Sequence, residues 1–199
     1  WDAKKLQEAT SKNGNGISAE EAIQKAVSAD EKRSTPNDPP RFFRVTMRNV
    51  RQFHRDELMN PRSVSNFLGK IAPVDFDASF AFAPDIRQYV SSVPGYQTYN
   101  IFMNGEKIVR PHAEQLPLHG KNSEGIKGIE TFAIKGPEGR DIGRGWYAVT
   151  KFLAALPPQA AMRGLRVRQG NIEIGDEYHL ANLYSERRFA SWHIGEVHL

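Results

Sequence analysis

Apolar and polar residues alternate with a period of two over residues 163–176, RGLRVRQGNIEIGD, and the phase of the alternation changes once. Before Gly170 two apolar residues alternate with arginines, and after it two isoleucines flank a glutamate. Successive side chains of a strand point to opposite faces, so the change of phase requires an irregularity at Gly170. A one-residue β-bulge in a single strand and a hairpin turning at Gly170-Asn171 both account for it.

Two segments have the 3.6-residue spacing of amphipathic helices. The first has Asn60 as N-cap and Pro61 at its first helical position, and its apolar residues are Val64, Phe67, Leu68 and Ile71. The second begins at Pro84, and its apolar face contains Ile86, Tyr89, Val90 and Val93. A capping box of Ser18 and Glu21 predicts a further helix near residues 18–27, and a short helix is expected at 179–184.

Two hairpins are predicted from turn residues. Asn104-Gly105, the preferred pair for a type I′ turn, lies between YNIFM and EKIV. The second hairpin pairs residues 126–136 with 140–150 around Pro-Glu-Gly. Strands are also expected at 41–50 and at 189–199, where the alternation again changes phase, at Gly195.

Charge and composition place few limits on the class of protein. The 199-residue chain has a net charge of +4 and a pI near 9.3, which permits nucleic acid as a partner without requiring it. It has no cysteine, which excludes a disulfide framework, a thiolate nucleophile and a cysteine-based zinc site. No stretch approaches the roughly 18–20 apolar residues of a spanning helix, so we expect a cytoplasmic protein with no membrane partner. A start without Met and an apolar strand-like end indicate a fragment of a longer protein.

The sequence predicts no catalytic residue and no metal site. It has no G-x-S-x-G elbow, and no Ser-His-Asp order can be assigned. His193, Glu196 and His198 resemble a set of metal ligands, but on one strand His193 points away from the other two, and no H-E-x-x-H helix is present. Two patterns similar to D-x-G-x-G, at residues 12–16 and 141–145, are interpreted as turns.

A basic surface is the one candidate binding feature. It would consist of five arginines that could contact phosphate or nucleic acid, with Tyr184, Phe189 and Trp192 available for stacking. The five are Arg163, Arg166, Arg168, Arg187 and Arg188. A strand with arginines on one face and apolar residues on the other is also typical of an ordinary amphipathic sheet, and that interpretation is favoured.

The order of these segments resembles the middle region of the GHKL ATPases, the gyrase, heat-shock-chaperone, histidine-kinase and MutL relatives. The nearest likeness is to chaperone-like bacterial ATP-binding proteins. It covers residues 41–199, and its most specific pieces are APVDF, FMNGEKIVRP and GLRVRQGNIEIGD. The resemblance implies an α+β transducer domain, with the mixed sheet, backing helices and left-handed βαβ crossover of the second domain of a small-subunit ribosomal protein. It also favours a bulged strand at Gly170, and so predicts a phase break without a chain reversal.

The resemblance further implies a role in sensing ATP. Residues 1–40, which end in the charged, Pro-rich run DEKRSTPNDPP, would be the tail of, or linker from, an N-terminal ATPase module. The middle domain would relay the state of that module to dimer or client contacts, and the intact protein would use ATP and Mg²⁺. The phosphate-sensing basic loop is expected beyond Leu199, so the 199 residues should hold no cofactor and have no activity alone. A nucleic-acid-binding module of the same fold is the alternative, and the residues identify neither a client nor an oligomeric state.

Overall fold

The computed structural model describes residues 4–5, 20–21, 24, 57–118, 123–151, 154–158 and 160–199. The chain divides into two compact units, residues 1–53 and 54–199. Residues 20, 21 and 24 of the predicted N-terminal helix are helical. The rest of that helix, the linker at 30–40, the strand at 41–50 and the boundary at residue 40 lie outside the described residues.

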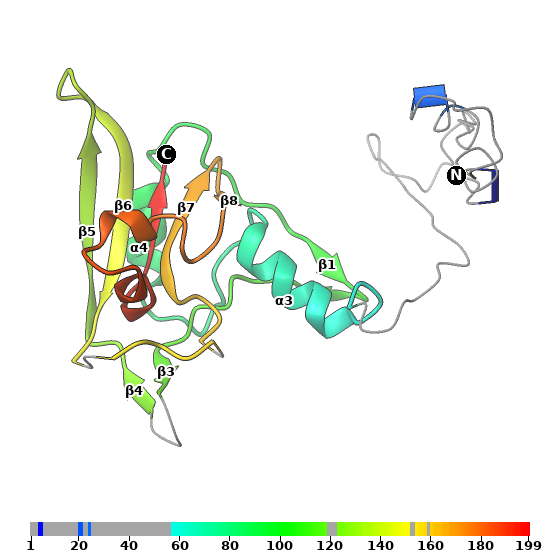
Figure 1. Cartoon of the computed structure of the whole chain (residues 1–199), viewed down its shortest axis with the longest axis horizontal. Helices are drawn as coiled ribbons and strands as arrows, with labels where there is room; N and C mark the ends of the chain where they lie inside the picture. Colours follow the sequence, from blue (N-terminus) through cyan, green and yellow to red (C-terminus); the bar gives the residue numbers. More distant parts are fainter. Residues whose placement is uncertain are drawn as a thin grey trace. The chain divides into compact units, whose positions relative to one another are not determined.

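A five-stranded sheet forms the framework of the second unit (Figure 1). Its strand order is β5-β6-β9-β7-β8. The strands are β5 (Gly128–Lys135), β6 (Asp141–Val149), β7 (Gly164–Gln169), β8 (Ile172–Ile174) and β9 (Ile194–His198). The β7–β9 pair is parallel and the other pairs are antiparallel, so the sheet is mixed and the fold class is α+β, as predicted.

Both predicted amphipathic helices are present. In α3 (Pro61–Ile71) the Asn60 side chain accepts hydrogen bonds from the backbone N–H groups of Arg62 and Ser63, so the predicted N-cap is confirmed. Helix α4 (Ala83–Val90) has a proline in its first turn and buries Ile86 and Val90.

The two predicted hairpins also form. The first consists of β1 (Phe102–Met103) and β2 (Glu106–Lys107), and both turn residues have positive φ, 53° at Asn104 and 86° at Gly105, as a type I′ turn requires. The second is the β5–β6 pair. A further two-stranded pair, not expected from the pattern, joins β3 (Gln115–Pro117) to β4 (Ser123–Gly125).

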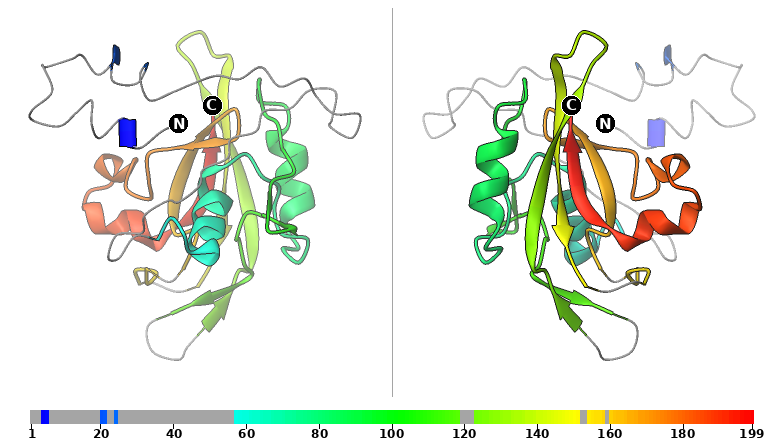
Figure 2. Two further views of the ribbon diagram at one scale, coloured as in Figure 1. Left: turned by 90° about the vertical axis from the view of Figure 1, so that its right-hand side faces the viewer. Right: turned by 90° about the vertical axis from the view of Figure 1, so that its left-hand side faces the viewer.

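Elements cover both faces of the sheet, as Figure 2 shows. Helix α4 lies on one face, and the 3₁₀ helices η1 (Ala181–Leu183) and η2 (Arg187–Trp192) lie on the other. The main apolar cluster packs under α4 around Trp146, which is fully buried. A smaller cluster of Ala72, Val74 and Ile108 packs against Leu68 of α3, and so fixes the end of that helix.

The expected bulge at Gly170 is wrong, because the chain reverses there. Strands β7 and β8 form an antiparallel hairpin in which Val167 pairs with Ile174 and Gln169 with Ile172. Gly170 and Asn171 both have positive φ, 55° and 67°, and two consecutive left-handed residues produce a tight turn rather than a bulge. The turn chemistry therefore decides between the two interpretations, against the one that the resemblance favours.

The expected phase break at Gly195 is also wrong. Strand β9 pairs with β7 without interruption from Ile194 to His198, and with β6 from Gly195 to His198. It is the central strand, and all five of its residues are buried. Because both faces of such a strand are covered, apolar residues occur on both, and a change in their alternation does not indicate an irregularity of the backbone. Residues 189–192, expected as the start of this strand, belong to η2 instead, and the short helix expected at 179–184 is reduced to η1.

Candidate functional site

Charged side chains occupy the face of the sheet that also carries Trp146. In the register of the sheet Arg166 lies opposite Glu196 and Arg168 opposite His198, and paired residues share a face. The two arginines are 4% and 0% exposed. They therefore point into the molecule, and the apolar residues that alternate with them point to the opposite face.

The Glu196 carboxylate accepts hydrogen bonds from four side chains. Arg110 Nη1 donates to Oε2 at 2.7 Å, and Arg168 Nε donates to Oε1 at 2.9 Å. His112 Nε2 lies 3.2 Å from Oε1 and His198 Nε2 lies 3.2 Å from Oε2. Each oxygen thus has two donors, which saturates the carboxylate. These five residues, Arg110, His112, Arg168, Glu196 and His198, are called the Glu196 hub below.

The two arginines of the hub also hold backbone from other elements. Arg168 Nη2 donates to the carbonyl of Lys70 in the last turn of α3, where a cation also interacts favourably with the helix dipole. Arg110 Nη2 donates to the carbonyl of Val74 at 2.9 Å and to the side chain of Asn171. The hub therefore connects β9, β7, the β7–β8 turn and the end of α3.

Asn171 links the hub to one more segment. Its side-chain amide donates to the carbonyl of Gln97 at 2.9 Å, and its own carbonyl accepts from Arg168 Nη1 at 3.0 Å. Asn171 is 1% exposed, so these bonds form out of contact with water. The residue that turns the hairpin is thereby also a structural partner of both hub arginines.

A second layer of ion pairs continues toward the edge of the sheet. Arg166 Nη1 lies 2.5 Å from Glu173 Oε1, and Arg163 Nη2 lies 2.9 Å from Glu177 Oε1. Glu173 Oε2 has no hydrogen-bond donor and is 3.9 Å from Arg168 Nη2. Positive and negative side chains thus alternate across β9, β7 and β8 on this face.

Burial and charge set the protonation states in the hub. Burial by itself would raise the pKa of the Glu196 carboxyl, but the charges of Arg110 and Arg168 outweigh it and hold that pKa well below its usual range. Burial lowers the pKa of His112 and of His198, which outweighs the opposing effect of their bonds to Glu196. At neutral pH the hub therefore contains an ionised carboxylate, two guanidinium groups and two neutral imidazoles.

Aromatic rings surround His112 and keep water from the hub. The centroid of the His112 ring lies 5.0 Å from that of Trp146, 5.4 Å from Phe80 and 5.5 Å from Phe76. The Arg110 guanidinium stands 4.6 Å above the centre of the Phe76 ring. These contacts place the charged groups in a medium of low dielectric constant, where an unpaired charge is costly.

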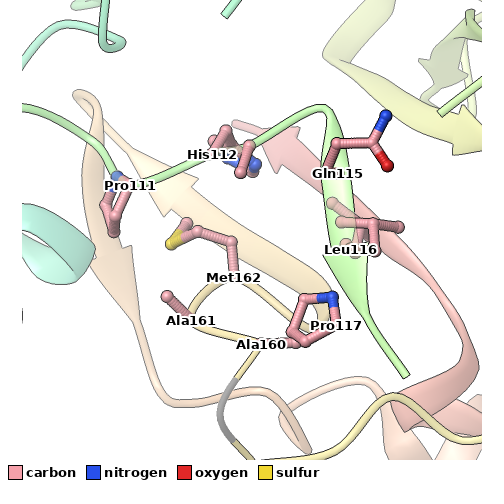
Figure 3. A pocket seen from close by; sticks show the side chains of 10 residues that line it. Pro111, His112, Gln115, Leu116, Pro117, Ala160, Ala161 and Met162 are labelled. Atoms are coloured by element: carbon pink, nitrogen blue, oxygen red, sulfur yellow. The ribbon is translucent and has the colours of Figure 1, made fainter. Parts of the chain in front are cut away.

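A small cavity of about 140 Å³ lies beside His112 (Figure 3). The segment 111–117 forms one wall and residues 160–162 face it, with Ile194 also lining the space. Its walls are mainly apolar, and the polar side chains among them are His112 and Gln115. The His112 N–H bonded to Glu196 is already used, so the hub offers no free carboxylate for acid–base chemistry there.

The structure does not bring the five predicted surface arginines together. Arg166 and Arg168 are buried, and Arg163 is 14% exposed in its pair with Glu177. Of the five, only Arg187 and Arg188 are exposed, so a five-arginine surface does not form.

The three residues that resemble metal ligands in the sequence, His193, Glu196 and His198, do not lie together either. His193 is exposed and stacks on Tyr184, with ring centroids 5.4 Å apart, whereas Glu196 and His198 belong to the buried hub. Within the described ranges, no group of three or more histidine, aspartate or glutamate side chains has the arrangement of a metal site.

Sequence reasoning missed Arg110 and His112, which it placed in a long polar loop. The sequence holds a signal for them, because Arg110 and His112 share the parity of the apolar residues Ile108 and Leu116, and the structure shows all four buried. The two polar residues thus occupy inward-facing positions between two apolar ones. This is the pattern of an extended segment that buries its charged side chains.

No family model, no curated protein and no solved structure matches this chain. Neither α3, α4 nor any other helix in the described part of the chain has the length and apolar character needed to cross a membrane.

Proposed function

We propose that the chain is the middle, or transducer, region of a chaperone-like GHKL ATPase. It relays the nucleotide state of an N-terminal ATPase module to contacts with a second protomer or a client. The resemblance of APVDF and FMNGEKIVRP supports the proposal, whereas the expectation that it gave for GLRVRQGNIEIGD, a bulged strand, is wrong. Support also comes from the mixed sheet, in which the adjacent parallel strands β7 and β9 are joined by a crossover through β8, η1 and η2. The ribosomal-protein-type topology and the left-handed crossover belong to this proposal.

The observation that carries the proposal is the Glu196 hub. Glu196 and His198 lie on the central strand, and the resemblance expects a phosphate-sensing loop directly after that strand. A displacement of the end of β9 would act on Arg168, and through it on the last turn of α3, because these groups are bonded in a closely packed interior. The hub is thus a rigid connection of the kind that a relay of nucleotide state requires.

The proposal assigns cofactor and partners to the intact protein. ATP and Mg²⁺ would bind in the N-terminal module, the middle domain would contact that module, and the protein would act as a homodimer in the cytoplasm. The client and the physiological task, whether chaperone activity, a DNA transaction or defence, are left open by these residues.

Nucleotide binding and hydrolysis test the proposal. Calorimetry with ATP and Mg²⁺ on the 199-residue chain should show no binding in the micromolar range, whereas the product of the whole gene should hydrolyse ATP. Micromolar binding by the 199-residue chain, or a whole-gene product without ATPase activity, would refute it.

A second candidate, nucleic-acid binding, rests on the exposed arginines of η2. The Arg187 guanidinium stands over the ring of Tyr178 at 5.5 Å, and Arg188 stands over Phe189 at 5.3 Å. Phe189 in turn makes an edge contact with Trp192, with centroids 5.1 Å apart. Exposed cations beside aromatic rings are typical of single-strand binding surfaces.

Fluorescence anisotropy with a labelled single strand distinguishes this candidate. Binding at low salt that falls steeply as salt rises, and that is lost in the R187A/R188A variant, would support a nucleic-acid surface. Absence of binding at low salt excludes it.

A further inference from the structure

We propose that the Glu196 hub is an acid-sensitive latch, which holds residues 108–112 and the end of α3 on the sheet at neutral pH and releases them when His112 and His198 take up protons. This inference concerns regulation of the fold itself and does not rest on the proposed function.

The tautomers of the two histidines make protonation unfavourable in the closed structure. Because ionised Glu196 can only accept, each ring donates through Nε2, and an added proton must go to Nδ1. His198 Nδ1 is buried and has no hydrogen-bond partner. A proton there would place an unpaired N–H and a positive charge in the interior, which is costly.

The charges that face the hub oppose further protonation. Arg110 and Arg168 against Glu196 leave one net positive charge, and two protonated histidines would raise it to three. Arg166 and Arg144, the latter opposite His198 on β6, are also cationic. The nearby neutral group is Tyr96, whose ring centroid is 5.5 Å from that of His198.

The carboxylates around the hub are each paired with an arginine, and none accepts a hydrogen bond from Nδ1 of His198. Glu196 already accepts four bonds, and Glu173 is engaged by Arg166. The backbone carbonyl of Asp75 accepts from the Arg110 N–H, and the Asp75 carboxylate is paired with Arg87. The repulsion between protonated histidines and the arginines is therefore relieved only when they separate, that is, when the latch opens.

The direction of the pH dependence follows from the lowered pKa values of both histidines. The closed form keeps them neutral, whereas an opened form takes up protons near the usual histidine pKa of about 6.5. Below that pH the ratio of opened to closed molecules rises about tenfold per pH unit for each histidine that takes up a proton. For two histidines the rise is up to about 100-fold per unit. Above pH 7.5 neither form is protonated and the effect vanishes.

Hydrogen–deuterium exchange of the full 199-residue chain tests the latch between pH 7.5 and 5.5, with rates corrected for the intrinsic effect of pH. Amides of residues 108–116 and of the last turn of α3 should lose protection by up to about 100-fold per pH unit below pH 6.5. The β5–β6 hairpin is the internal reference and should lose much less. Unchanged protection of 108–116, or an equal loss in β5–β6, would overturn the latch.

Glutamine variants identify the titrating groups. The H112Q/H198Q variant keeps an N–H donor at each site but cannot titrate, so its protection should be nearly independent of pH. The control H193Q removes an exposed histidine outside the hub and should keep the full dependence. If the double variant does not fold, H112Q and H198Q alone should each reduce the slope to about tenfold per unit. An unchanged slope in the variants that fold would overturn the proposal, as would an NMR titration showing both rings protonated above pH 6 in the folded chain.

Discussion

Replacement of Glu196 by glutamine tests whether the hub depends on its single carboxylate. The substitution keeps the shape of the side chain but removes the negative charge between Arg110 and Arg168, which lie 2.7 Å and 2.9 Å from it. It also turns one acceptor oxygen into an NH₂ group that faces existing donors. Arg110 would then be buried without a carboxylate partner, and Arg168 would keep only the longer contact with Glu173 Oε2, at 3.9 Å.

The substitution should lower the free energy of unfolding by a large amount for a single isosteric change. Removal of one partner from a buried ion pair costs about 3–5 kcal/mol, against a total free energy of unfolding of about 5–15 kcal/mol for a typical domain. Chemical unfolding at pH 7.5, followed by circular dichroism, should therefore show a midpoint shifted strongly to lower denaturant for E196Q.

Glu186→Gln is the matched control. It removes the same charge from a 2.7 Å ion pair with Arg188, but there both side chains are more than half exposed. Exposed pairs contribute about 0–1 kcal/mol, so E186Q should unfold close to the parent midpoint. If E196Q lost less than about 1 kcal/mol, or no more than E186Q, the view that Glu196 compensates two buried guanidinium groups would be refuted.

Three further substitutions test particular contacts by the same unfolding measurement. Gly145→Ala should destabilise the unit by about 1–3 kcal/mol, since a Cβ there would overlap the ring of Phe132, and an unchanged midpoint would contradict that packing. Asn60→Ala removes the side-chain cap of α3 and should cost about 0.5–2 kcal/mol, with a matching loss of exchange protection in the first turn. Asn171→Gly keeps a residue that tolerates φ of 67° but deletes the bonds to Arg110 and to the Gln97 carbonyl, and should cost about 1–3 kcal/mol. A neutral result for the glycine variant would mean that the turn conformation alone is what matters at that position.

The elements that the sequence predicted well are those set by local chemistry. The Asn-Gly turn at 104–105 and the N-cap at Asn60 depend on residues within four positions of one another. The β5–β6 hairpin is similarly local, since its strands are joined by a short turn. In each case the decisive contacts lie within the window over which a pattern is read.

The orientation of β7 could not be predicted from its pattern. Alternation shows that two faces differ, but it does not show which face is buried when the polar residues are arginines. The partners that make burial possible are distant, because Glu196 is 28 residues from Arg168 and 86 residues from Arg110. No local pattern reports such a pairing, and the interpretation of the arginines as the polar face of an amphipathic sheet therefore missed that this face is buried as well.

The position of β9 has a consequence for how the chain folds. The hairpins β5–β6 and β7–β8 form from neighbouring residues, but neither is hydrogen-bonded to the other, and β9 joins them. Before residues 194–198 are synthesised, the nascent chain can therefore form only two separate hairpins, and Arg168 of the second lacks its partner Glu196. Completion of the sheet is expected to be a late, long-range and comparatively slow step, since loop closure must precede the contacts that repay it.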